Sequence, residues 1–191
     1  MEDFAGDARA SVEAVRKIRE IDPGRVGLFG ISQGGRIAPL AADRQDTIAF
    51  IVNVSGGVLS VDASLLHESR QTLRQKGMPG WMADAFGPFA AAVAKRRNRT
   101  WWKKNGTYDP LPYWESLEVP ALVVYGAEDE HDNVPVVRSV ALLEKLEPSV
   151  DLTIEVFPSI GHGLFEPGTR TIRSEALKLF VRCVREKAPA N

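Results

Sequence analysis

The sequence predicts an α/β protein with a mostly parallel β-sheet, helices on both sides and a helical insertion over one end of the sheet. Short apolar runs alternate with helix-like stretches, as expected when helices connect parallel strands. Residues 60–116 break this alternation; helix-forming stretches dominate them, and all four tryptophans lie there. We therefore expect a core built from residues 1–59 and 117–191, with residues 60–116 forming a cap.

Composition and charge exclude several classes of protein. Apolar residues make up 44% of the 191 residues and charged residues 26%, which is ordinary for a globular domain. The formal net charge of −1 gives no reason to expect nucleic acid or a membrane as a partner. Cys183 is the only cysteine, so no disulfide can form within the chain.

The sequence shows no targeting segment and no cofactor motif. The first residues lack the basic stretch and apolar run of a signal peptide, and no apolar run approaches the length of a membrane span, so we expect a cytoplasmic protein. Zinc-ligand spacing, a phosphate-binding glycine loop and a dinucleotide fingerprint are all missing. We therefore expect neither a metal nor a cofactor.

The first part of the chain predicts a helix, a strand, a second helix and a second strand. Apolar residues recur every three or four positions over residues 4–18, which indicates one buried helix face, and a turn follows at residues 22–24. A strand is expected at residues 25–29 and a helix at residues 36–42. The nearly continuous apolar run 48–54 is typical of a strand buried on both faces of a parallel sheet.

The last part of the chain continues this pattern after the insertion. Strands are expected at residues 121–125 and 152–157, with a helix at about 136–146 between them. A final helix is expected at about residues 172–186, with Cys183 among its apolar residues.

A nucleophile-elbow pattern lies between the first strand and the second helix. Residues 30–34 read Gly-Ile-Ser-Gln-Gly, which matches G-x-S-x-G in the expected strand–turn–helix context. Ser32 would be the nucleophile. Gly30 and Gly34 would allow the close backbone approach that the tight turn needs. The alternative is an ordinary loop rich in glycine and serine.

A serine nucleophile needs a base, and the base needs a carboxylate to orient it. Of the three histidines, His162 follows the fourth strand and lies between two glycines, so we expect it to be the base rather than His67 or His131. Asp129 and Asp132 both lie on the loop after the third strand. We favour Asp129 and keep Asp132 as the alternative.

These motifs resemble those of α/β-hydrolases, in which the chain order is Ser, Asp, His. More narrowly, they resemble capped bacterial serine hydrolases similar to dienelactone hydrolases and prolyl-oligopeptidase-like proteins. The likeness covers the elbow G-x-S-Q-G-G at residues 30–35, G-x-x-D and the following V-P at residues 126–135, and F-P with H-G at residues 157–163. The acid loop is two residues longer than in those relatives, which keeps Asp132 open.

The resemblance implies an enzyme that cleaves a small-molecule ester or acyl substrate. Ser32, His162 and Asp129 would form the catalytic triad, and the backbone N–H of Gln33 would stabilise the oxyanion. The reaction would be carboxylic ester hydrolysis through an acyl-enzyme. The alternatives are a peptidase, and an acyl-CoA thioesterase or acyltransferase of the same fold.

The resemblance also implies that part of the usual core is absent. In this fold the elbow strand is the fifth, yet only 24 residues precede position 25. We therefore expect the first four strands, and the loop that supplies a second oxyanion donor, to be missing. The edge at residues 26–29 would be apolar and unpaired, and would favour a homo-oligomer. The alternative function is a non-catalytic remnant that self-associates.

Two features of the insertion leave alternatives open. Its aromatic residues either line an apolar pocket for an acyl or alcohol group or pack within the cap. A basic cluster is either a solvated helix face or a site that attracts an anionic substrate such as a coenzyme A thioester. The cluster consists of Lys95, Arg96, Arg97, Arg99, Lys103 and Lys104.

Overall fold

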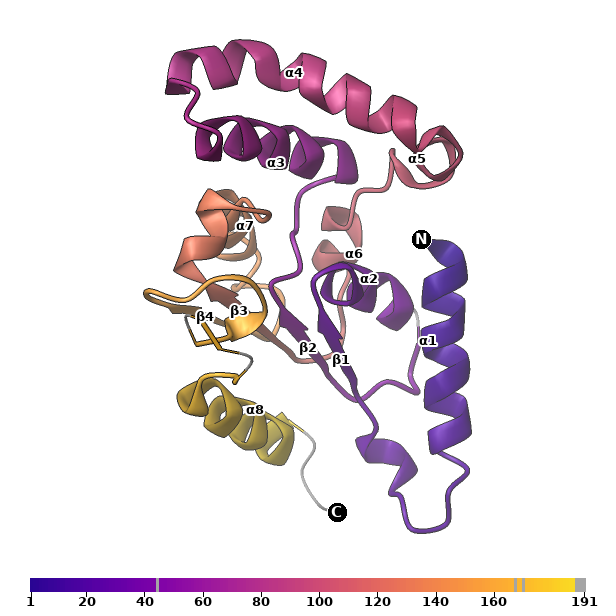
Figure 1. Cartoon of the computed structure of the whole chain (residues 1–191). Coiled ribbons are helices and arrows are strands. Elements are labelled where there is room, and N and C mark those ends of the chain that lie inside the picture. Colours follow the sequence, from indigo (N-terminus) through magenta and orange to yellow (C-terminus); the bar gives the residue numbers. More distant parts are fainter. Residues whose placement is uncertain (44, 167, 170, 188–191) are drawn as a thin grey trace.

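The predicted α/β class is confirmed by the computed structural model, which describes residues 1–43, 45–166, 168–169 and 171–187. Four parallel strands form one sheet in the order β1-β2-β3-β4. Helices cover both faces of the sheet, and a stack of helices lies above one end of it (Figure 1). None of the described helices is long and apolar enough to cross a bilayer.

The strands are β1 (Leu28–Ile31), β2 (Ile51–Val54), β3 (Ala121–Gly126) and β4 (Leu152–Phe157). The prediction for β4 is confirmed, and β3 is one residue longer than predicted. β1 and β2 each begin three residues later than predicted, although Ala49 N–H already donates to Val26 C=O at 2.8 Å. The two chains therefore approach each other before regular pairing begins.

The helices of the core alternate with these strands. They are α1 (Glu2–Val15), α2 (Gln33–Ala42), α7 (Val136–Leu143) and α8 (Ser174–Lys187). A 3₁₀ turn, η1 (Pro23–Arg25), precedes β1; η2 (Ala127–His131) follows β3 and η3 (His162–Leu164) follows β4. Since all four strands run in the same direction, the segments that follow them meet at one edge of the sheet.

Alternating side chains of the strands build two apolar layers, one on each face of the sheet. The layer toward α2 and α7 contains Ile51, Val123 and Tyr125, with Val12 of α1 and Leu143 of α7. The layer toward α8 contains Val52, Val54, Leu122 and Val124, with Leu179, Phe180 and Cys183 of α8. Cys183 therefore has a packing role.

The segment 60–116 lies between β2 and β3 and contains α3 (Val61–Gln75), α4 (Gly80–Arg97), α5 (Arg99–Asn105) and α6 (Leu111–Glu115). α3, α4 and α5 form the stack above the sheet, whereas α6 lies lower, beside it (Figure 1). Trp114 of α6 is fully buried in the same layer as Val123. One of the four tryptophans thus belongs to the core rather than to a pocket.

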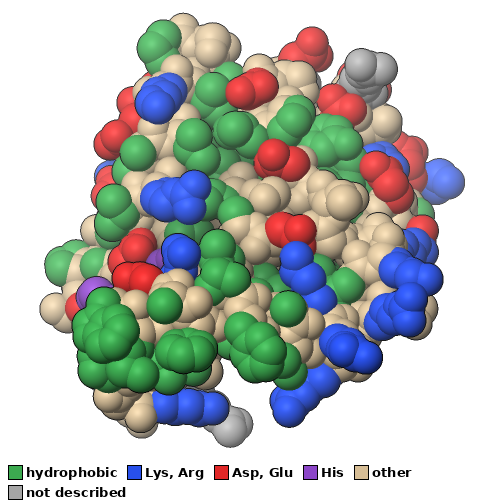
Figure 2. Space-filling model, turned by 90° about the horizontal axis from the view of Figure 1, so that it is seen from above, with side chains coloured by type: hydrophobic (Ala, Val, Ile, Leu, Met, Phe, Trp, Pro, Cys, Tyr) green, Lys and Arg blue, Asp and Glu red, His purple; other side chains and the backbone are tan. Residues whose placement is uncertain are grey.

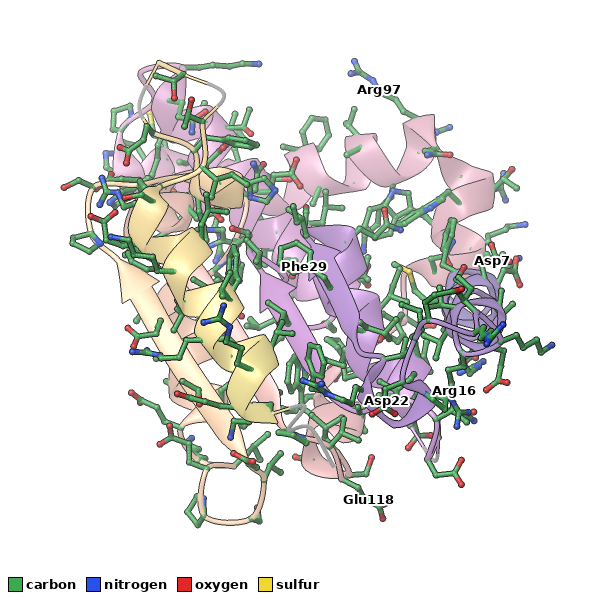
Figure 3. The ribbon with its side chains drawn as sticks, turned by 90° about the horizontal axis from the view of Figure 1, so that it is seen from below. Asp7, Arg16, Asp22, Phe29, Arg97 and Glu118 are labelled. Carbon is green, nitrogen blue, oxygen red and sulfur yellow. The ribbon has the colours of Figure 1, made fainter. Side chains whose placement is uncertain are left out.

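The outer side of β1 pairs with no strand of the described residues. Phe29 remains 53% exposed, and Ile31 is exposed beside it. The ring of Phe29 meets Phe180 of α8 edge-on, with ring centroids 5.2 Å apart, so Phe29 lies on the side of the sheet that α8 covers (Figure 3). An apolar unpaired edge of this kind favours pairing with another strand.

We expect the protein to self-associate through β1, and the Phe29→Lys variant to be less associated, because a charge on an edge strand opposes strand pairing. Sedimentation velocity over a range of concentrations would measure the effect. Val137→Lys, at an exposed site on α7, is the matched control. A wild-type chain that stays monomeric at every concentration would contradict the expectation.

Candidate active site

The chain between β1 and α2 forms a tight turn with Ser32 at its apex. Ser32 has φ 55° and ψ −115°, a conformation that costs a non-glycine residue about 1–3 kcal/mol. Its N–H donates to Val54 C=O at 2.8 Å, and its C=O accepts from Arg36 N–H at 3.1 Å. Bonds to β2 on one side and to α2 on the other therefore hold Ser32 in this strained geometry.

The glycines around Ser32 differ in how much space a Cβ atom would have at each position. A Cβ at Gly30 would lie 2.4 Å from the carbonyl carbon of Gly34, so the expected close approach at Gly30 is confirmed. The same expectation for Gly34 is wrong, because a Cβ there would meet no described atom within 4 Å. The second crowded position is Gly35, where a Cβ would lie 2.0 Å from Asn53 Oδ1.

Asn53 is a buried side chain of β2 that sequence reasoning did not single out. Its Nδ2–H donates to Gly56 C=O at 3.0 Å, and its Oδ1 accepts from Gly56 N–H at 2.8 Å. Tyr125 O–H donates to the same carbonyl at 2.9 Å. These bonds fix the turn after β2, in which Ser55 also has a positive φ of 53°. A polar residue within an apolar strand was the available clue.

Asp129 and His162 are brought together from the segments after β3 and β4. Asp129 is fully buried on η2, and its Oδ1 and Oδ2 lie 2.9 and 3.1 Å from His162 Nδ1 on η3. Since a carboxylate only accepts hydrogen bonds, Nδ1–H is the donor and Nε2 is left for other partners. This bond raises the pKa of His162 above its usual range, while partial burial opposes the shift.

The alternative acid, Asp132, is exposed, and its Oδ2 accepts from Asn133 Nδ2–H at 2.8 Å. The structure therefore pairs His162 with Asp129 and not with Asp132. Asp132 makes only the smallest contribution to the raised pKa of His162.

The His162 loop is attached to the ends of β2 and β3. Gly163 N–H donates to Ser55 Oγ at 3.1 Å, and Glu128 N–H donates to Ile160 C=O at 2.9 Å. A Cβ at Gly126 would lie 2.3 Å from Ile160 O, so the loop packs directly on the end of β3. Ser55 is thus a positioning residue for His162 that the sequence did not reveal.

The other two histidines lie outside this arrangement. His67 of α3 bonds through Nε2 to Glu130 C=O at 2.8 Å, and Gln71 Nε2–H donates to the same carbonyl at 3.0 Å. These two bonds tie α3 to the segment that carries Asp129. His131 is exposed, and its C=O accepts from Gln75 Nε2–H at 2.9 Å.

Ser32 and His162 line one pocket of about 340 Å³ between the edge of the sheet and the helices α3 and α5. No hydrogen bond joins Ser32 Oγ to His162 within the described part of the chain. Helices α3 and α5 contribute an apolar wall made of Val61, Leu65, Trp101 and Trp102. Two of the four tryptophans therefore line the pocket, whereas Trp81 is exposed elsewhere on the cap.

The pocket near Ser32 contains both the cationic side chain of Arg36 and the carboxylate of Glu68. Gln33 and Arg36 also line the pocket; Gln33 begins α2, where the first backbone N–H groups have no partner within the helix, and Arg36 brings a guanidinium. Arg36 Nη2–H donates to Ser64 Oγ at 2.8 Å, and among the described residues its guanidinium makes no ion pair. Burial lowers the pKa of Arg36.

The described residues contain no group of three or more His, Cys, Asp or Glu side chains that could hold a metal ion. The chemistry that this arrangement can perform is acyl transfer. It provides a serine on a strained turn, an oriented imidazole, and free N–H groups at the start of a helix.

A comparison with family models matches residues 3–186 to the prolyl oligopeptidase family. No curated protein matches the sequence. Solved structures that resemble it include an esterase of Pyrococcus furiosus (19% identity, TM-score 0.60, 96% of this chain and 61% of that one). An acylaminoacyl peptidase of Pyrococcus horikoshii is also similar (18% identity, TM-score 0.64, 94% and 26%).

A third similar structure comes from Klebsiella pneumoniae and carries the provisional name dienelactone hydrolase (17% identity, TM-score 0.57, 97% of this chain and 62% of that one). At these identities the likeness shows the fold alone. The chain spans about three fifths of the esterase and about one quarter of the peptidase.

We expect Gly35→Ala to lower the free energy of unfolding by roughly 1–3 kcal/mol, because its Cβ would overlap Asn53. Gly34→Ala is the matched control, since the space there is open and alanine favours a helix by about 0.5–1 kcal/mol. Urea unfolding of both variants measures the difference. Equal urea midpoints for Gly35→Ala and Gly34→Ala would contradict the conclusion that position 35 is the crowded one.

We expect Asp129→Asn to lower the pKa of His162 clearly, and Asp132→Asn to lower it only slightly, because Asp129 is the main cause of the raised value. NMR titration of the imidazole, assigned with His162→Gln, measures both shifts.

A raised pKa means that protonated His162 stabilises the fold. This contribution is complete below the pKa of unfolded histidine and is lost as pH rises through the folded value, so this pH-dependent step in stability should shrink in Asp129→Asn. Similar shifts of the His162 pKa in Asp129→Asn and Asp132→Asn would contradict the pairing of His162 with Asp129.

Proposed function

Since this chain belongs to the prolyl oligopeptidase family, we propose that it is a serine hydrolase that cleaves carboxylic esters. The observation that carries the proposal is the bond between buried Asp129 and His162 Nδ1, in the pocket that Ser32 also lines. An imidazole oriented in this way can take a proton from a serine hydroxyl.

In the proposed reaction, His162 Nε2 removes the proton of Ser32 while Ser32 Oγ attacks the ester carbonyl carbon. The N–H of Gln33 donates to the oxyanion, and Asp129 stabilises the imidazolium. The C–O bond to the alcohol breaks, and His162 returns the proton to the departing oxygen. Water, deprotonated by His162, then attacks the acyl-enzyme and releases the carboxylic acid and Ser32.

The pocket supports a small-molecule ester rather than an extended peptide as substrate. A volume of about 340 Å³ lies at the lower end of the range for small-ligand pockets. The apolar wall that Leu65, Trp101 and Trp102 contribute suits a short acyl or alcohol group. Peptides and acyl-CoA thioesters need the same acyl-transfer chemistry, so they remain the alternative substrates.

The proposed oxyanion site has one assigned donor, the N–H of Gln33. Removal of one donor from such a site costs about 2.7–4 kcal/mol of transition-state stabilisation, or 10²–10³ in rate.

A second candidate function is non-catalytic self-association through β1. The exposed side chains of Phe29 and Ile31 on an edge without a described partner strand favour it. The two candidates differ in turnover: a folded chain that associates but hydrolyses no ester would support the second.

We expect Ser32→Ala to lower hydrolysis of p-nitrophenyl acetate and butyrate by about 10⁴-fold or more, because the nucleophile is lost. Ser11→Ala, an exposed serine on α1, is the control and should retain the wild-type rate. A serine-reactive fluorophosphonate should label the wild type and not Ser32→Ala. Rates with an acyl-CoA and an aminoacyl p-nitroanilide would rank the substrate classes. A folded wild type that is inert toward every substrate and unlabelled would overturn the proposal.

A further inference from the structure

The cap helix α4 packs on α3 through small residues. Ala83, Gly87 and Ala91 are buried and recur every four positions, so they lie on one face of the helix. A Cβ at Gly87 would lie 2.5 Å from Arg70 Cγ, which shows how closely the two helices approach. Asp84 pairs with Arg74 at 2.7 Å and so also fixes α4 to α3.

The opposite face of α4 is apolar and faces outward. Trp81 is 73% exposed, Phe89 71% and Phe86 50%, and Val93 is exposed on the same side. Phe89 is eight residues after Trp81, and Val93 is four residues after Phe89, so the three lie along one stripe of the helix. A helix that is apolar on both faces is normally covered on both. Single exposed apolar residues are common, whereas an aromatic stripe of this kind marks an interaction site.

The apolar stripe is followed by strong positive charge. Residues 80–105 contain six basic residues and one acidic residue, Asp84, which the arginines of α3 neutralise. Lys95 pairs with Asp62 and Lys104 with Asp3. The remaining four make no ion pair with described residues and are exposed: Arg96, Arg97, Arg99 and Lys103. Figure 2, which looks onto the cap, shows apolar side chains along one border and Lys and Arg side chains beside them.

We propose that the outer face of α4 binds the surface of an anionic lipid membrane. Trp81, Phe86 and Phe89 would enter the boundary between headgroups and acyl chains, because aromatic residues on an amphipathic surface prefer that region. The basic residues at the end of α4 and on α5 would bind the lipid phosphates, each contributing about 1 kcal/mol, or about fivefold in partition.

Charge favours an anionic membrane over a second copy of the chain as the partner of this face. A second α4 face would bring no complementary charge to the basic cluster, because residues 80–105 contain one acidic residue, Asp84, which the arginines of α3 already neutralise. An anionic bilayer instead complements both the apolar stripe and the basic cluster. The helix would lie along the surface, since it is not long and apolar enough to span the bilayer. The proposal is independent of the catalytic assignment.

The test is binding of the whole chain to vesicles of phosphatidylcholine with and without phosphatidylglycerol, followed by sedimentation and tryptophan fluorescence. We expect binding to the anionic vesicles only, a blue shift of the emission, and weaker binding as salt rises. Trp81→Phe should retain binding but lose most of the blue shift, because Trp81 is the most exposed tryptophan in the described residues.

Two variants separate the apolar and electrostatic contributions. Phe89→Asp should lower the partition coefficient by about tenfold or more, because it places a charge in the apolar stripe. Arg96→Gln with Arg97→Gln should lower it by about 25-fold. Leu177→Asp, at an exposed apolar site on α8, is the matched control and should leave binding unchanged. Circular dichroism and thermal unfolding establish that each variant is folded.

Three results would overturn the proposal. The first is a folded wild type that fails to bind anionic vesicles at low salt. The second is a loss of binding in Leu177→Asp as large as in Phe89→Asp. The third is a dimer, seen without lipid, that Phe89→Asp dissociates, because the face would then join copies of the chain. If Phe89→Asp does not fold, the proposal is tested with the wild type alone. It stands if the wild type binds anionic but not neutral vesicles and if salt weakens that binding, and it is overturned otherwise.

Discussion

The contact between Gly35 of α2 and the Asn53 side chain of β2 is the constraint on which the rest of the candidate site depends. Because position 35 carries no Cβ, α2 can begin directly against β2, and the turn before it holds Ser32 at a positive φ. The same Asn53 amide bonds Gly56 through both its oxygen and its nitrogen, which shapes the turn that contains Ser55. One buried amide therefore lies against the start of α2 and also fixes the turn after β2.

Two strained serines follow neighbouring strands, and the sheet itself holds them. Ser32 N–H donates to Val54 C=O, and Ser55 N–H donates to Val124 C=O, so each bond continues the parallel ladder by one step beyond a strand. Since positive φ at a serine costs free energy, buried backbone bonds of this kind are what keep it populated. Ser55 in turn bonds Gly163, which links the sheet to the loop of His162.

Local patterns in the sequence predicted most of the fold, because apolar runs and turn residues act over a few positions. The pairing of Asp129 with His162 was also accessible, since the ends of parallel strands meet at one edge. The roles of Asn53 and Ser55 could not be predicted from the sequence, because they arise from contacts with residues that are distant in sequence or on the next turn. Gly34 was misjudged because a glycine pattern cannot tell which backbone lies nearby.

Helix α3 is attached to the segment that carries Asp129. His67 and Gln71 both bond the carbonyl of Glu130, the residue directly after Asp129. A displacement of α3 that keeps these bonds would pull on the peptide beside Asp129 and tilt the carboxylate that orients His162. The position of the buried Asp129 carboxylate, and with it the orientation of the His162 ring, therefore depends on how α3 packs above the sheet.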